Sequence, residues 1–363
     1  MKKLAYLLIG DFSNSPGVMK KVNNEIKAFE NAGIECELIN VVDKNSKFVA
    51  ALPFSSKQNF SKVIIPDNID CLYVRHVPLT FPLVQLMEKA KDKGIKVVME
   101  IGTYPSYRAE LKEISNPITY YRDVFYANKL ENIVDRIVIC TNFTEVYNVP
   151  AVQITNMIKV DDIKQITSYF FGKDEAINVL AVARLAYWHG YDRFIEGLHR
   201  YYNTFNETRN VIFHVVGVGI AYDGLQKLAR KYGLEEHVKF YGQLTGTTLD
   251  EMYEIADIGI DCLGTHRKDD TWFGTLKSME YLGKGLPFIT EYPIPESVNE
   301  VKKYILKVPA DESPVDIESV ISFYRQLKEE RKQDIVSNMR KFAYSYCDIS
   351  VAMKPVIDYL LEE

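Results

Sequence analysis

The segment Thr275–Thr290 contains side chains and backbone groups that could bind a charged ligand. A helix is predicted to begin in it, directly after a loop that contains a glycine. The first amides of an α-helix have no acceptor within the helix, and the positive end of the helix dipole lies at the same place. The amides of Thr275, Leu276 and Lys277 could therefore hold a diphosphate, and the Lys277 ammonium would add positive charge.

Glu280 lies about one helical turn beyond Lys277 on the same predicted helix. A carboxylate in this position can accept hydrogen bonds from the hydroxyl groups of a ribose. The alternative is a surface ion pair between the two side chains. Their place at the start of a helix that leads into a predicted strand favours the ligand site.

Arg184 follows a predicted buried strand, Asn178–Ala183. A guanidinium group at the carboxyl end of a core strand points to the region where α/β folds bind ligands, and its planar fork suits phosphate. A pair with a structural carboxylate is the alternative, and the position at a strand end favours the ligand. His189 could reach the same anion, although a loop histidine without a ligand is an equal alternative.

Glycines occur in two further turns that could approach a ligand. Gly17 opens a predicted helix at the end of the loop Asp11–Lys21. Gly217 and Gly219 follow the predicted strand Val211–Val216 and could form a tight turn near a phosphate or a sugar. Each turn by itself is explained better by ordinary chain reversal, because glycine is common in turns.

The elements that would position these residues alternate between short apolar runs and amphipathic stretches. The predicted strands are Leu4–Ile9, Ile34–Ile39, Cys71–Arg75, Lys96–Ile101 and Arg136–Cys140 in the first half, and Asn178–Ala183, Val211–Val216, Val238–Tyr241, Ile258–Cys262 and Pro287–Thr290 in the second. This alternation indicates parallel sheets covered by helices. We therefore predict an α/β chain with two Rossmann-like domains that face a central cleft.

The composition agrees with two globular domains. The 363 residues exceed what one core usually holds, and 47% hydrophobic with 26% charged residues exclude disorder. The net charge of -5 gives no general affinity for nucleic acid. The five cysteines are scattered without a Cys-x-x-Cys pair, so neither a disulfide framework nor a zinc site is expected.

The N-terminus predicts a buried strand and not a signal peptide. The apolar run Leu4–Ile9 is short, and Asp11 follows it closely. No apolar run reaches the length of a membrane span. We expect a cytoplasmic protein that touches a membrane only at its periphery.

Together and in order, these residues resemble the retaining GT-B glycosyltransferases of the glycogen-synthase-like group. The resemblance is closest to bacterial enzymes that build capsule, O-antigen or exopolysaccharide, and it covers nearly the whole chain. The second domain carries it through Arg184, Gly217, Gly219, Val238–Gly242, Ala256, Asp257, Lys277, Glu280 and Gly285–Pro287. In the first domain, Gly17 stands where the family has its first glycine-rich loop, and Ile154–Asn156 resembles the segment between the domains.

The resemblance implies that these residues bind a nucleotide-sugar donor. Arg184 would bind the donor diphosphate and, with Lys277, stabilise the leaving group, while Glu280 would bind the ribose. The other residues implied in donor binding are Gly17, Gly217, Gly219, Gly242 near the base, Thr275, Leu276 and His189. Fixed cations and a helix N-terminus would stabilise the leaving charge, so neither a metal ion nor another cofactor is expected.

The chain departs from the family pattern at two donor positions. Trp272 stands where the first glutamate of the E-x7-E motif is expected, with Asp269 and Asp270 close by. His189 stands in place of the phosphate-binding lysine, and Lys277 would supply the missing charge.

The first domain also departs from the pattern, because the histidine often found in the loop after its fourth or fifth strand is absent. Thr103, Tyr104 or Arg108 would shape that part of the site. The acceptor would sit near Gly17, Arg75 and Thr103–Arg108.

The predicted domain boundaries follow from the pattern and the resemblance. The polar stretch Lys159–Lys173 marks the joint, and the terminal helix of the family crosses back to the first domain, as Val351–Glu363 would here. We predict an acceptor domain of residues 1–160 and 346–363 and a nucleotide-sugar domain of residues 161–345.

The expected activity is retaining transfer of a hexose from a nucleoside-diphosphate sugar to a glycan or lipid-linked acceptor in cell-surface polysaccharide synthesis. Two other activities stay open from the sequence. One is a nucleotide-sugar epimerase of the same fold, and the other is a non-catalytic subunit that binds a nucleotide sugar.

Overall fold

The computed structural model describes residues 1–12, 16–42, 44–46, 54–102, 104–105, 107–114, 117–168, 176–205, 208–268 and 274–362. Thr103, Asp269, Asp270 and Trp272 lie outside the described residues. The chain divides into two compact units, residues 1–157 with 349–363 and residues 158–348. From the sequence, the first stretch of the first unit is predicted to end at residue 160 and its second stretch to start at residue 346.

The first unit is built on a sheet of seven strands in the order β2-β1-β3-β4-β5-β7-β6. The strands are β1 (Lys3–Ile9), β2 (Glu35–Val41), β3 (Cys71–Arg75), β4 (Lys96–Ile101), β5 (Arg136–Ile139), β6 (Glu145–Val146) and β7 (Val149–Gln153). All neighbours are parallel except β6, which pairs antiparallel with β7.

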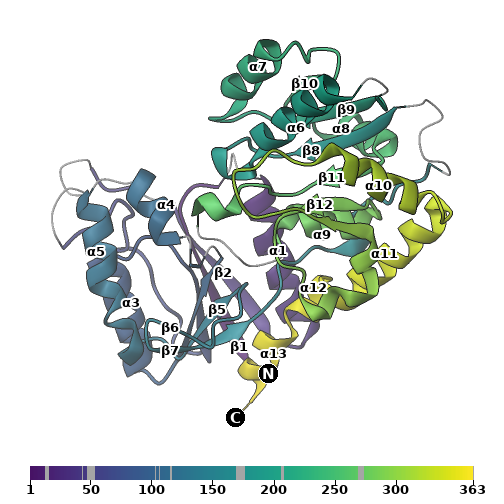
Figure 1. Ribbon diagram of the computed structural model, residues 1–363. Coiled ribbons are helices and arrows are strands. Elements are labelled where there is room, and N and C mark those ends of the chain that lie inside the picture. The colour runs from purple at the N-terminus through teal and green to yellow at the C-terminus, as the bar shows by residue number, and fades with distance from the viewer. Residues whose placement is uncertain are drawn as a thin grey trace. The chain divides into compact units, whose positions relative to one another are not determined.

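Both faces of this sheet are covered, which explains why its strands read as continuous apolar runs. Leu4, Tyr6 and Leu8 of β1 point to one face, where α1 (Pro16–Asn31), α12 (Ile349–Ala352) and α13 (Lys354–Leu361) pack. The alternate residues of β1 point to the other face, where α3 (Phe81–Asp92) and α5 (Pro117–Ala127) pack. The helix α4 (Tyr107–Ile114) follows β4. Both chain termini lie in this unit, close to each other (Figure 1).

The second unit is built on a parallel sheet of six strands in the order β10-β9-β8-β11-β12-β13. The strands are β8 (Ile177–Val182), β9 (Val211–Val216), β10 (Val238–Gly242), β11 (Ile258–Ile260), β12 (Phe288–Thr290) and β13 (Ile305–Lys307). Its helices are α6 (Tyr191–Thr204), α7 (Tyr222–Lys231), α8 (Gly246–Ile255), α9 (Leu276–Lys284), α10 (Ile317–Leu327) and α11 (Lys332–Tyr346). Since all six strands are parallel, the loops that leave their carboxyl ends gather along one edge of the sheet.

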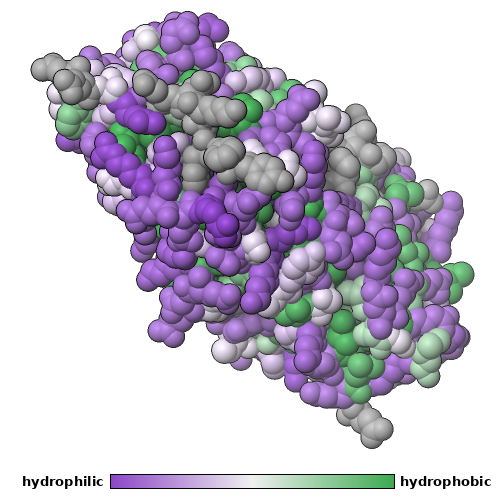
Figure 2. Space-filling view, turned by 90° about the vertical axis from the view of Figure 1, so that its right-hand side faces the viewer, coloured by the Kyte–Doolittle hydropathy of each residue, from purple (hydrophilic) through white to green (hydrophobic). Residues whose placement is uncertain are grey.

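The predicted fold class, an α/β chain with two Rossmann-like domains, is confirmed by these two sheets. Within the described residues, no helix has both the length and the apolar character needed to cross a bilayer. Hydrophilic side chains cover most of the face shown in Figure 2, and hydrophobic side chains appear there in small separate groups.

Candidate functional site

Arg184 lies two residues beyond the end of β8, at the edge where the strands of the second unit end. Its side chain is exposed. Among the residues that the structure describes, it forms no ion pair and no hydrogen bond. The structural pair that was the alternative for this arginine is therefore not formed, and the guanidinium is free to meet an anion.

Gly217 and Gly219 hold the backbone around Arg184 in place. A Cβ atom on Gly217 would lie 1.8 Å from the carbonyl oxygen of Ala183, and one on Gly219 would lie 2.2 Å from that of Leu185. The amide of Gly217 donates to the carbonyl of Gly242 over 2.6 Å. Three of the four glycines predicted as donor-binding residues, Gly217, Gly219 and Gly242, thus lie side by side, and the close backbone approach explains why two of them must lack a side chain.

The helix α9 begins with a capped first turn. Oγ1 of Thr275 accepts a hydrogen bond from the Ser278 amide at 3.2 Å and donates to Oδ1 of Asp261 at 2.5 Å. Within the described part of the chain, the amides of Thr275, Leu276 and Lys277 have no acceptor. These are the three amides predicted to bind phosphate, so the backbone geometry that the prediction requires is present.

Asp261 anchors this helix start, and its part was not foreseen from the sequence. It follows β11, is fully buried and accepts hydrogen bonds from Thr275, from Ser278 at 3.2 Å and from Thr290 at 3.5 Å. Burial raises its pKa, and the nearby Lys277 ammonium and these hydroxyl groups oppose the rise. The available signal was an acidic residue at the end of an otherwise apolar strand.

Lys277 points back toward the residues that follow β11. Its Nζ donates to Sγ of Cys262 at 3.2 Å and lies 3.9 Å from Oδ1 of Asp261. Burial alone would lower the pKa of Lys277, but Cys262, Tyr191 and Asp261 together raise it, so the ammonium stays charged. The surface ion pair with Glu280 is not formed.

His189 is buried and held as a neutral ring. Its Nδ1 accepts the Ala186 amide at 3.1 Å, and its ring stacks on Tyr191 with 5.4 Å between centroids. Burial, followed by the charges of Lys277 and Lys268, lowers its pKa to about 2. His189 can therefore offer one N–H group to a ligand but no positive charge, and Lys277 and Lys268 are the cations near it.

Close backbone packing joins the loop after β8 to the loop after β11. Gly190 has a φ of 65°, and a Cβ atom there would lie 2.3 Å from the carbonyl carbon of Leu263. The Leu263 amide donates to the carbonyl of His189 at 2.9 Å. This contact keeps His189 next to the chain that carries Asp261 and Lys277.

A buried ion pair fixes the short helix that follows, η4 (Thr265–Lys268). Glu291, which comes directly after β12, accepts from Arg193 at 2.9 Å and from the amide of His266 at 3.0 Å. It also accepts from both the amide and the hydroxyl of Thr265. Arg193 and Glu291 are each 1% exposed, so this pair is a core element that the sequence did not reveal.

Glu280 and Gly17, two further residues predicted to bind the donor, lie on helices of different units. Glu280 is partly buried on α9, one turn beyond Lys277, and its charge contributes to the raised pKa of Tyr253, whose main cause is burial. Gly17 lies in the first turn of α1 in the first unit.

Lys21, on the same helix as Gly17, packs among charged side chains. Its Nζ lies 2.6 Å from Glu100 and 3.6 Å from Glu25, and its side chain is 9% exposed. Arg75 reaches Glu100 at 3.4 Å from the other side. Burial, followed by the charge of Glu100, raises the pKa of Glu25 to about 7.

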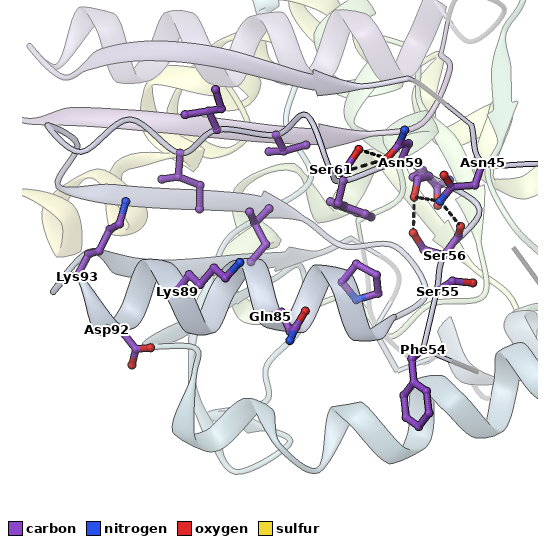
Figure 3. Close-up of a pocket in the computed structure, with 17 residues that line it drawn as sticks. Asn45, Phe54, Ser55, Ser56, Asn59, Ser61, Gln85, Lys89, Asp92 and Lys93 are labelled. Atoms are coloured by element: carbon purple, nitrogen blue, oxygen red, sulfur yellow. Dashed lines mark hydrogen bonds between the residues drawn. The ribbon is translucent and has the colours of Figure 1, made fainter. Parts of the chain in front are cut away.

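A cavity of about 800 Å³ in the first unit lies elsewhere, between the segment Phe54–Ile65 and α3 (Figure 3). Amides and hydroxyls line it beside apolar side chains, and the charged Lys89, Asp92 and Lys93 lie at its α3 end. Beside the cavity, Nδ2 of Asn45 donates hydrogen bonds to the carbonyls of Ser56 at 3.0 Å and Gln58 at 3.2 Å. None of the residues predicted for donor binding lines this cavity.

Among the described residues, no group of three or more histidine, cysteine or acidic side chains is arranged to hold a metal ion. Asp269 and Asp270 lie outside that part of the chain.

Residues 165–261 match a family model described as glycosyl transferases group 1. The match spans the strands β8, β9, β10 and β11 and includes Arg184, His189, Gly217, Gly219 and Gly242. Within these residues the chain is similar to this glycosyltransferase family, and the match supports the predicted enzyme class, a glycosyltransferase. A search among curated protein sequences finds no match.

Solved structures of glycosyltransferases share the fold over the full length of the chain. A glycosyltransferase from Rickettsia africae ESF-5 is 13% identical with a TM-score of 0.65, covering 100% of this chain and 99% of the other. Anabaena Alr3699/HepE in complex with UDP-glucose is 14% identical with a TM-score of 0.64. Sucrose-phosphate synthase from Thermosynechococcus elongatus is 12% identical with a TM-score of 0.62. The last two alignments each cover 99% of both chains. At this identity the similarity establishes the GT-B fold.

Proposed function

We propose that the protein is a retaining glycosyltransferase that moves a hexose from a nucleoside-diphosphate sugar to a glycan or lipid-linked acceptor in the synthesis of a cell-surface polysaccharide. The observation that carries the proposal is the exposed and unpaired Arg184 at the carboxyl end of β8, along the same sheet edge as the free amides that begin α9. The similar structure of Anabaena Alr3699/HepE holds UDP-glucose, which supports a nucleotide sugar as the donor.

The proposed chemistry is departure of a nucleoside diphosphate. Negative charge grows on the leaving phosphate oxygen as the glycosidic bond breaks. Arg184 and Lys277 are positive, and the amides of Thr275, Leu276 and Lys277 are oriented donors that need no rearrangement when this charge appears. Preorganised donors of this kind stabilise a transition state more than the ground state, and this set does so without a metal ion.

In the same proposal, Glu280 binds the ribose hydroxyls, and the neutral His189 donates one hydrogen bond from Nε2 to the donor. Gly217, Gly219 and Gly242 border the nucleotide. The acceptor binds to the first unit. We place the reaction in the cytoplasm.

Contact with the inner membrane face is also part of this proposal, and α5 supports it. Ile118, Tyr121 and Phe125 recur on this helix at spacings of three and four residues, which places them on one face. They are 68%, 70% and 57% exposed. An apolar stripe on a surface helix suits the boundary between lipid and water.

Donor binding by the full chain tests the proposal. We expect UDP-glucose, GDP-mannose or ADP-glucose to bind in calorimetry, and the preferred donor to be hydrolysed slowly and transferred faster with an acceptor. Arg184→Ala should lower kcat/KM for transfer by roughly 100- to 1,000-fold, the usual effect of losing one preorganised donor. Arg200→Ala is the matched control, because Arg200 is exposed on α6 and makes no described contact.

Two results would overturn the proposal. Normal turnover by Arg184→Ala at saturating donor would remove the role of this arginine. Tight donor binding with no transfer to any saccharide acceptor would favour the non-catalytic binding subunit, and donor conversion without an acceptor would favour an epimerase.

A further inference from the structure

Buried polar atoms without a hydrogen-bond partner are concentrated in one part of the first unit. Among the described residues, twelve buried side-chain nitrogen and oxygen atoms lack a partner, and eight of them belong to residues between 76 and 147. Folded proteins leave few such atoms, because each one costs free energy that a partner would recover. A concentration of eight atoms indicates a place where a polar ligand supplies the partners.

Three of these residues lie at the carboxyl edge of neighbouring strands. His76 follows β3 directly, Arg108 is in the first turn of α4 after β4, and Thr141 follows β5 closely. The strands β3, β4 and β5 are adjacent and parallel, so their carboxyl ends meet. Parallel sheets bind ligands at this edge.

Arg108 presents one complete edge of its guanidinium without a partner. Its Nε and Nη2 are both buried and make no hydrogen bond, and no carboxylate lies within ion-pair distance in the described structure. In the planar guanidinium these two nitrogens point their hydrogens to the same side. That edge matches two oxygens of a carboxylate or a phosphate, which an arginine binds in a bidentate manner.

Aromatic rings adjoin the same guanidinium. Cζ of Arg108 lies 4.5 Å from the centre of the Tyr147 ring, Tyr104 lies 6.0 Å from Tyr147, and Phe143 lies 5.2 Å from Tyr104. Phe143 is 42% exposed and Arg108 is only partly buried, so the group lies just beneath the surface. Aromatic faces beside a few fixed polar groups are typical of small-molecule sites, and they suit the C–H faces of a sugar ring.

Two buried side chains near this arginine have an atom without a hydrogen-bond partner: the neutral ring of His76 and the carboxylate of Asp123. Nε2 of His76 and Oδ1 of Asp123 are 4.0 Å apart, and the two side chains are 3% and 1% exposed. Oδ1 of Asp123 is held by the Leu79 amide at 2.8 Å and by the Tyr107 hydroxyl at 3.0 Å, whereas Oδ2 is unpartnered. The unpartnered Nε2 and Oδ2 can each bond to a sugar hydroxyl.

The charge balance of this cluster favours an anion. Burial, followed by the charge of Arg108, lowers the pKa of His76 to about 3, so this ring is neutral. Among the described side chains, Arg108 and Arg122 lie near the carboxylate of Asp123, so the described part of the cluster carries one positive charge in excess. An incoming oxyanion would compensate it.

We propose that Arg108, with His76, Asp123 and Tyr147, forms a binding site for a saccharide that carries a carboxylate or a phosphate, with the oxyanion on the Nε and Nη2 edge of Arg108. The site would hold the acceptor, and this assignment rests on the proposed function. The acceptor is then an acidic saccharide and not a neutral one.

Binding of simple probes by the full chain tests the site. The probes are glucuronate for the carboxylate, glucose 6-phosphate for the phosphate, and glucose as the neutral control. We expect at least one acidic probe to bind at least tenfold more tightly than glucose in calorimetry. Arg108→Lys keeps the charge but loses the bidentate edge, and should weaken that probe at least tenfold. Tyr147→Phe keeps the ring, removes one unpartnered hydroxyl, and should weaken it about threefold.

Lys112→Gln is the matched control, because Lys112 is an exposed cation on the same helix. It should leave probe affinity unchanged, and all three variants should bind UDP as the parent chain does. The carboxylate and the phosphate are distinguished by which acidic probe binds more tightly.

Three outcomes would overturn the inference: equal affinity for glucose and both acidic probes, unchanged acidic-probe affinity in both Arg108→Lys and Tyr147→Phe, or no probe binding by a chain that binds UDP. The last result would mean that water fills the cluster. A chain that binds an acidic probe through Arg108 but no nucleotide sugar would keep this site and remove the proposed function.

Discussion

At the scale of single residues, two different side chains of the second unit supply a hydrogen-bond donor and a positive charge: His189 is neutral, and Lys277 is the cation. His189 occupies the position of an expected lysine, yet its Nδ1 is used by Ala186 and its pKa is lowered to about 2 by burial and by nearby lysines. The charge therefore comes from Lys277, whose pKa is raised by Cys262, Tyr191 and Asp261 against the effect of burial. Lys277 therefore supplies the positive charge that the family resemblance assigns to a separate lysine at position 189.

We expect Lys277→Ala to lower kcat/KM for transfer by roughly 100-fold or more, because it removes the ammonium that Cys262 and Asp261 hold at the start of α9. The loss should appear mainly in kcat, since charge on the leaving diphosphate is greatest in the transition state. Lys302→Ala, an exposed lysine of the same unit, is the control. Steady-state kinetics with a saturating acceptor measure the effect, and an unchanged kcat would contradict the assignment.

The sequence identified residues whose chemistry shows in their type and position. Arg184, Lys277 and the amides before Glu280 could be named because a strand end and a helix start have known unsatisfied groups. Asp261 and Glu291 could not be named, because their importance depends on partners distant in the sequence, such as Thr275 and Arg193. The neutral state of His189 likewise follows only from its burial.

At the scale of elements, glycines set the distance between neighbouring loops of the second unit. Gly217 has a φ of 122°, and its Cα approaches the carbonyl of Ala183 so closely that no side chain fits. The Arg184 loop is therefore held by backbone packing against the loop after β9.

Gly217→Ala should destabilise the protein by more than about 2 kcal/mol, because the Cβ meets backbone and the φ angle is unfavourable for alanine. Gly224→Ala provides the matched control. Gly224 lies in α7 with no atom within 4 Å of an added Cβ, so alanine there should stabilise the chain by about 0.5–1 kcal/mol. Urea unfolding of both variants measures the difference, and equal stability of the two would contradict this reading of the loop.

The strands were more predictable than the small elements between them. The strands β3, β4 and β9 have the predicted bounds, because their apolar runs are bordered by polar residues and glycine. The hairpin of β6 and β7 was missed, since its strands are short and its turn is formed by Tyr147 and Asn148 with positive φ, without a glycine to mark it. The short β13 was missed for lack of a long apolar run.

At the scale of the whole molecule, the two units carry different chemistry. The second unit presents Arg184 and the start of α9, whereas the first holds a buried group of two cations and two carboxylates. In that group, Glu25 is fully buried, and its pKa is raised from the ordinary value of 4.5 to about 7. The first unit should therefore respond to pH near neutrality.

The direction of this response follows from proton binding. The folded chain holds the Glu25 proton more tightly than the unfolded chain, so the stabilisation is fully present below pH 4.5 and is lost as the pH rises through about 7. Its size is on the order of 3 kcal/mol. The buried neutral rings of His76, His189 and His214 act in the opposite direction over this range. We therefore expect the stability difference between the parent chain and Glu25→Gln to change by this amount between pH 5 and 7, with the parent losing stability relative to the variant. Glu30→Gln, an exposed site on the same helix, should show no such change relative to the parent.

The tryptophans allow this effect to be assigned to one unit. Trp188 and Trp272 are the two tryptophans of the chain, and both positions fall within residues 158–348. We expect Glu25→Gln to change the pH dependence of a transition seen by far-UV circular dichroism and to leave that of the fluorescence-detected transition as in the parent chain, where His189 and His214 set it. UDP should act in the opposite way and stabilise the fluorescence-detected transition, by about 2.7 kcal/mol at a concentration of 100 Kd. Coincident transitions that move together with pH and with UDP would mean that the two units unfold as one.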